Sequence, residues 1–159
     1  MKFKKTIWFV LLCVSVFILF SCLRAHEINF PADSSSFVGT WVLSSAPKGL
    51  KDRFQNGLPS STLILQTNGR AIYSVPIDSN HTAGGGPSVP SDWYFSAGEG
   101  AWSFMDWGHK GWHIWRVDLQ TDKIGIQFTL KRELSGKTIL VYVPDPNSDE
   151  AVVFSRSQK

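Results

Sequence analysis

Cysteine is scarce in this chain, and none follows residue 22. The two cysteines, Cys13 and Cys22, lie within an apolar N-terminal segment and at its end. An excess of one charge is also lacking, because 13 basic residues face 13 acidic ones once Lys2, Lys4 and Lys5 of that segment are set aside. The scarcity of cysteine excludes a disulfide framework. The balanced charge argues against nucleic acid or anionic lipid as a partner.

The chain also lacks an apolar run long enough to cross a bilayer with ease. Its longest run, Ile7–Phe20, has about fourteen residues, whereas a membrane-spanning helix needs roughly 20. Lysines precede this run, so the segment has the basic and apolar halves of a secretory signal. We therefore expect residues 1–21 to be a signal peptide.

The end of this signal resembles the lipobox of bacterial lipoproteins. Leu19 stands at −3, Ser21 at −1, and Cys22 at the position that is lipidated after cleavage. The resemblance implies a lipid-anchored protein of the bacterial cell envelope, and Leu23 in place of Asp favours the outer membrane in a cell with two membranes. A plain secreted protein is one alternative, because Phe20 is unusual at −2. An uncleaved transmembrane anchor is the other, although the apolar run is short for it.

Beyond the signal we expect a lipidated Cys22 with a tether over residues 22–36, then one domain over residues 37–159. This domain has no helix-length amphipathic pattern and shows short β-like runs instead. The runs are Phe37–Leu43, Thr62–Gln66, Arg70–Val75, Ala101–Trp107, Trp112–Leu119, Ile124–Lys131, Thr138–Val143 and Ala151–Arg156. Because turn-sized connections join most of them, we predict an all-β domain, a single eight-stranded antiparallel meander that closes as an up-and-down barrel. An open β-sandwich is the alternative.

Two short patterns support this prediction most directly. Ile124–Lys131 alternates apolar and polar residues with period 2, which is typical of a strand with one buried face. Asn68-Gly69 lies between two β-like runs and predicts a hairpin with a type I′ turn. Two longer connections interrupt the rhythm, and we expect a turn of helix at Lys51–Gln55 and a loop at Asp78–Asp92.

The first run of the domain resembles the G-x-W opening strand of lipocalins and of small lipocalin-like bacterial lipoproteins. Its residues Gly39 and Trp41 carry the motif, and Arg156 ends the last run. In lipocalins this Trp plugs the closed end of the barrel, and a basic residue packs across its ring. The resemblance implies a lipocalin-like barrel with Gly39, Trp41 and Arg156 as structural residues, and an Arg–Trp contact is worth ~0.5–2 kcal/mol.

Tryptophans gather in one part of the domain, and alternation places aromatic side chains on both faces of the hairpin there. The residues concerned are Trp93, Trp102, Trp107, Trp112 and Trp115. Core filling is one interpretation of this density. The others are contact with a small apolar or aromatic ligand and contact with a protein partner, so we treat the five as candidate contact residues.

Catalytic motifs are missing, so we expect no enzyme activity, no cofactor and no metal. His109 and His113 have the spacing that suits a metal on a helix, but on a strand residues four apart lie roughly 13 Å apart. No serine stands in a G-x-S-x-G elbow. Glu99 and Asp92 are candidate cleft carboxylates.

Together these features predict a monomeric, non-enzymatic envelope lipoprotein that is held to the membrane by its lipid. The Trp-rich hairpin favours a small apolar or aromatic ligand in the barrel mouth. The alternative is a protein-interaction role, as an envelope assembly factor or as a tethered inhibitor or immunity protein, with the barrel filled by its own side chains.

Overall fold

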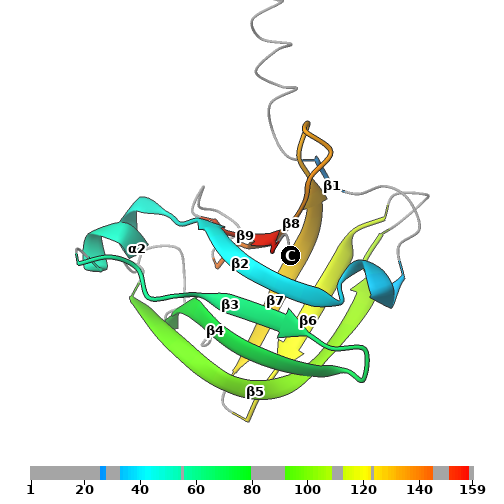
Figure 1. Cartoon of the computed structure of the whole chain (residues 1–159), viewed down its shortest axis with the longest axis horizontal. Helices are drawn as coiled ribbons and strands as arrows, with labels where there is room; N and C mark the ends of the chain where they lie inside the picture. Colours follow the sequence, from blue (N-terminus) through cyan, green and yellow to red (C-terminus); the bar gives the residue numbers. More distant parts are fainter. Residues whose placement is uncertain are drawn as a thin grey trace, which may run out of the picture.

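The computed structural model describes residues 33–54, 56–79, 92–108, 113–122, 124–144 and 151–157, together with the backbone of 26–27. Within these ranges the chain is mostly β-structure (Figure 1). The elements are β1 (His26–Glu27), η1 (Ser34–Ser36), β2 (Gly39–Ser45), α2 (Lys48–Arg53), β3 (Thr62–Leu65), β4 (Arg70–Asp78), β5 (Trp93–Asp106), β6 (Trp115–Gln120), β7 (Gly125–Arg132), β8 (Thr138–Tyr142) and β9 (Val152–Arg156).

The strands β2 to β9 close into one antiparallel barrel. Each pairs with the next along the chain, and β9 lies between β8 and β2. In the closing pair Trp41 lies opposite Arg156, and Val42 lies opposite Ser155. The predicted all-β fold, a lipocalin-like up-and-down barrel of eight strands, is confirmed, and the alternative of an open β-sandwich is wrong.

The two ends of the barrel differ in what they carry. The end that we name the Trp41 end holds η1, the start of β2, the end of β9, and the β3–β4, β5–β6 and β7–β8 connections. The opposite end, named the Tyr142 end, holds α2, the end of β8, and the β4–β5 and β6–β7 connections. The short strand β1 falls within the expected tether and pairs with Lys131 and Arg132 of β7 at the Trp41 end.

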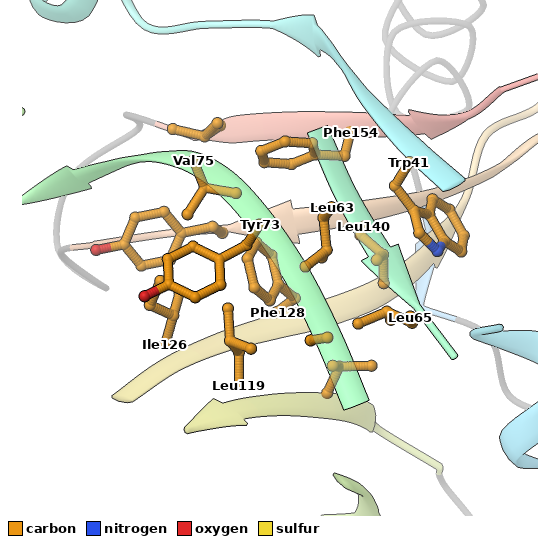
Figure 2. Packing of buried hydrophobic residues seen from close by; sticks show 14 of the residues in the cluster. Trp41, Leu63, Leu65, Tyr73, Val75, Leu119, Ile126, Phe128, Leu140 and Phe154 are labelled. Carbon is orange, nitrogen blue, oxygen red and sulfur yellow. The ribbon is translucent and has the colours of Figure 1, made fainter. Parts of the chain in front are cut away.

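Large apolar side chains meet inside the barrel. Alternation buries Ile126, Phe128 and Leu130 on one face of β7, as predicted. The Phe128 ring meets Phe154 edge to face at 5.8 Å and lies 6.0 Å from the Tyr142 ring. Figure 2 shows side chains from many strands of the barrel pointing toward one another, among them Trp41, Leu63, Tyr73, Leu119, Phe128, Leu140 and Phe154. Residues 33–157 thus contain the complete barrel and its core.

The fifth strand is longer than predicted. It begins at Trp93 instead of Ala101, and its first part pairs with β4 along the whole of that strand. Small residues around Gly98 hide the strand pattern in the sequence. A Cβ at Gly98 would lie 3.2 Å from the Tyr73 hydroxyl, so the glycine leaves room for the Tyr73 side chain of the neighbouring strand.

The β3–β4 connection is a hairpin, as predicted, but the expected type I′ turn is wrong. The Gln66 N–H donates to the Arg70 carbonyl at 2.9 Å, and the Gly69 N–H donates to the Gln66 carbonyl at 3.1 Å. These bonds enclose a three-residue loop in which Gly69 has a φ of +79°, the arrangement usual for hairpins of this length. The predicted helical turn is also shifted, because α2 spans Lys48–Arg53 instead of Lys51–Gln55.

Candidate functional site

Trp41 and Arg156 form the plug at one end of the barrel. The Arg156 guanidinium carbon lies 5.1 Å from the centroid of the Trp41 ring. The Trp41 Nε1–H donates to the Phe37 carbonyl at 2.8 Å, and Arg156 Nη2 donates to the carbonyls of Ser36 at 2.9 Å and Val38 at 3.0 Å. One pair of side chains therefore satisfies three successive carbonyls of the segment that leads into β2.

Gly39 connects that segment to β2 with a φ of +137°, an angle that residues with a side chain rarely adopt. A Cβ at this position would lie 3.7 Å from Arg156 Nε, which is ordinary contact. The backbone angle, and not a lack of space, therefore requires glycine here. The three residues that the lipocalin resemblance singles out lie together in the structure.

Most of the candidate tryptophans are core residues. Trp102 and Trp115 are buried toward the Trp41 end, and Trp93 is buried at the Tyr142 end. Trp107 is 55% exposed, and Trp112 lies outside the described residues. Core filling accounts for Trp93, Trp102 and Trp115, whereas Trp107 presents its ring at the surface.

The tip of the β5–β6 hairpin carries an apolar surface around Trp107. Phe104 and Met105 of β5 are also exposed, and the Arg116 guanidinium carbon lies 5.1 Å from the centroid of the Trp107 ring. Phe104 also stacks on the buried Phe37 ring, with 5.7 Å between the centroids. The hairpin is therefore held against the Trp41 end while part of its aromatic surface stays in contact with solvent.

Asp106 organises the turn of this hairpin. Its Oδ2 lies 2.5 Å from His113 Nδ1, and the His113 ring stacks on Trp115 at 5.4 Å. Its Oδ1 accepts hydrogen bonds from the backbone N–H groups of Gly108 at 2.8 Å and Ile114 at 3.2 Å. The His113 hydrogen bond, followed by that of Gly108, holds the pKa of Asp106 below its usual value.

The remaining polar candidates form ion pairs or fall outside the structure. Glu99 pairs with Arg70, and Asp92 pairs with Arg53; all four side chains are at least half exposed. His109 lies outside the described residues. Within the described ranges, no group of three His, Cys, Asp or Glu side chains is placed to hold a metal ion.

A polar cluster that the sequence did not suggest bridges the Tyr142 end. Asp78 ends β4 and is 1% exposed, and Tyr142 ends β8, the strand opposite β4 in the ring. Burial raises the pKa of Tyr142 to about 12. The Asp78 carboxylate and the Tyr94 phenol add to this rise in pKa, and a hydrogen bond from the Asp78 backbone opposes it. These groups therefore meet across the mouth of the barrel.

The β4–β5 hairpin and α2 bring this cluster together. The last four residues of β4 are all buried, and the Asp92 N–H donates to Asp78 Oδ1 at 3.0 Å. The ion pair of Asp92 with Arg53 fastens α2 to the start of β5. In the sequence, only the two tyrosines Tyr94 and Tyr142 point to this cluster. They lie far apart along the chain, and their spacing does not predict that they meet.

Trp93 leaves one polar atom at this end without a partner. Its ring belongs to the core that also contains Leu50 of α2, beside the edge-to-face pair of Phe54 and Phe95. The Trp93 Nε1–H is buried and donates to no acceptor among the described residues. A buried donor without an acceptor costs ~1–3 kcal/mol. A bound group that accepts a hydrogen bond from this N–H would remove that cost.

Comparison of the chain with protein-family models, with curated proteins and with solved structures finds no match. The part of the chain that the structure describes contains no helix with the length and apolarity needed to span a membrane.

Proposed function

We infer that this protein is a lipid-anchored, non-enzymatic component of the bacterial cell envelope that works through its outer surface, in contact with another envelope protein. The basic and apolar signal with its lipobox-like end at Cys22 supports the anchor, and Leu23 favours the outer membrane in a cell with two membranes. An envelope assembly factor and a tethered inhibitor or immunity protein both fit this description.

The packing of the barrel supports a role for its outer surface. The interior of an eight-stranded barrel is wide enough either to be filled by side chains or to hold one small ligand, and here large buried side chains from the barrel strands occupy it. Trp41 and Arg156 plug one end, while Tyr142 and Asp78 meet across the other. A barrel that is bridged at both ends leaves its outer surface as the place where a partner binds.

A small apolar or aromatic ligand at the Tyr142 end is the second candidate. The neighbouring phenols of Tyr94 and Tyr142 would serve the polar group of such a ligand. To enter the barrel, the ligand would first have to separate Tyr142 from Asp78. Contact of a partner with the outer surface needs no such rearrangement, so we favour the surface role.

Replacement of each cysteine in turn tests the anchor. In bacterial cells that are fed labelled palmitate, the wild-type chain should incorporate the label and Cys22→Ala should accumulate as an unlabelled precursor. Cys13→Ala is the matched control, because it changes the other cysteine within the signal, and it should be labelled like wild type. Labelling of Cys22→Ala at the wild-type level would reject lipidation at this residue.

A further inference from the structure

The start of the described chain fixes where a lipid on Cys22 would have to lie. Strand β1 pairs with β7, His26 opposite Arg132 and Glu27 opposite Lys131, where β7 continues beyond its pairing with β6. Four peptide units separate Cys22 from His26. Because an extended chain spans at most ~3.6 Å per residue, the two Cα atoms are no more than about 14 Å apart. A lipid on Cys22 therefore brings the membrane to the Trp41 end.

The same end carries most of the exposed apolar side chains. Among the described residues, six large hydrophobic side chains are exposed, and four of them lie at this end: Phe104, Met105, Trp107 and Leu134. The first three are at the tip of the β5–β6 hairpin, and Leu134 is in the β7–β8 turn, where it is 55% exposed. β1 pairs on the β6 side of β7, so the chain enters between the two hairpins. These positions suit contact with the membrane that the anchor approaches.

Basic side chains accompany these apolar ones, although the sequence shows no basic cluster. Arg132 and Lys137 are exposed on either side of Leu134, and Arg116 lies over the Trp107 ring. Glu133 lies between them in the chain, so the end is mixed in charge with a basic surplus in this turn. Tryptophan and basic residues are characteristic of the lipid–water interface, where rings sit at headgroup level and cations meet phosphates.

We propose that the Trp41 end of the barrel rests on the lipid bilayer, with Leu134 and Trp107 at the level of the headgroups, and that the Tyr142 end points away from it. This orientation rests on the proposed anchor at Cys22. It leaves α2 and the exposed residues of the Tyr142 end as the surface that a protein partner reaches.

Two labelled positions at opposite ends of the barrel test the orientation. The lipidated full chain is placed in vesicles of phosphatidylethanolamine and phosphatidylglycerol, with a fluorophore on Ser135→Cys beside Leu134 or on Asp122→Cys in the β6–β7 turn. Both residues are exposed. Nitroxide-labelled lipid should quench the Ser135 probe several-fold more than the Asp122 probe, and aqueous iodide should show the reverse order. Equal quenching at the two positions, or stronger lipid quenching at Asp122, would overturn the proposal.

A charge at Leu134 tests whether this side chain enters the interface. In the Ser135→Cys background, Leu134→Glu should lower quenching by nitroxide lipid, whereas Val143→Glu, which alters an exposed apolar residue at the opposite end, should not. Unchanged quenching in Leu134→Glu would remove Leu134 from the contact. Palmitate labelling of the same preparations separates the two proposals. A labelled chain whose Ser135 probe lies in water overturns the orientation alone. An unlabelled chain overturns the anchor.

Discussion

At the scale of single residues, the Trp41–Arg156 pair joins strand closure to the backbone of the incoming segment. The two residues lie opposite each other in the β2–β9 pair, and their side chains cover the carbonyls of Ser36, Phe37 and Val38. Trp41 is fully buried, so its loss leaves a cavity as well as an unsatisfied carbonyl. The contact between Trp41 and Arg156 thus joins β2, β9 and the segment that leads into β2.

Substitutions at these two residues should therefore be coupled. On residues 33–157, Trp41→Ala should lower the free energy of unfolding by ~3–5 kcal/mol, since a large aromatic core side chain is removed. Arg156→Ala should lower it by ~1–2 kcal/mol through lost stacking and hydrogen bonds. Urea unfolding of the double variant should show a smaller loss than the sum of the two.

The matched control for this coupling is Arg70→Ala. Arg70 of β4 forms an exposed ion pair with Glu99 of β5, two strands away from β2 in the barrel, and such pairs contribute ~0–1 kcal/mol. Its effect should add to that of Trp41→Ala within error. Full additivity of Trp41→Ala with Arg156→Ala would show that the plug contact makes no energetic contribution.

Tyr142 makes stability depend on alkaline pH. The fold raises its pKa from 10.0 to about 12, so the neutral phenol is favoured in the folded state. The resulting stabilisation is complete below pH 10 and is lost as the pH rises toward 12. A shift of this size corresponds to about 3 kcal/mol.

Tyr142→Phe should remove this part of the pH dependence. Urea unfolding between pH 10 and pH 12 should show a smaller loss of stability in Tyr142→Phe than in wild type. Phe128→Leu, which alters a ring beside Tyr142 that does not titrate, should keep the wild-type dependence. Equal alkaline losses in wild type and Tyr142→Phe would contradict the buried position of the phenol.

At the scale of elements, alternation of apolar and polar residues predicted most strands of the barrel and failed for a strand that lacks this alternation. Ile124–Lys131 alternates cleanly, and β7 follows it within a residue. In β5, Gly98 leaves room for the Tyr73 side chain and Gly100 for the Gln120 carbonyl, so Trp93–Gly100 has no readable alternation. The meeting of Asp78 with Tyr142 depends on how a long hairpin curves over the mouth, and no local spacing encodes that curvature.

The β5–β6 hairpin provides a test at this scale. Because the pKa of Asp106 is lowered by its hydrogen bonds to His113 and Gly108, the carboxylate stabilises the turn above its ordinary pKa of 3.8. This stabilisation is lost as the pH falls through the lowered value. Hydrogen-exchange protection of the Trp107 amide, which donates to the Ile114 carbonyl, should therefore fall in acid.

Asp106→Asn should weaken protection of the Trp107 amide at neutral pH and flatten its acid dependence. The control is Asp118→Asn, which changes a carboxylate of β6 that accepts from Gln127 Nε2. That variant should retain the wild-type profile at Trp107. Identical profiles for wild type and Asp106→Asn would mean that Asp106 does not hold the turn.

At the scale of the whole molecule, the two ends of the barrel differ in what they carry. The Trp41 end holds the plug, the incoming chain and the exposed apolar tips, and the Tyr142 end holds the polar bridge and α2. Between them the interior is occupied by side chains of the barrel itself. We propose that this interior is structural and that the outer surface performs the function.

A binding titration on residues 33–157 tests this proposal. Tryptophan fluorescence of the wild type is followed while fatty acids and small aromatic compounds such as benzene are added. Leu63→Ala is the positive control, because removal of this fully buried side chain opens an apolar cavity of the kind that binds benzene. We expect saturable benzene binding in Leu63→Ala and no change in the wild type at micromolar concentrations. Saturable binding to the wild-type barrel would contradict the proposal and favour a ligand carrier.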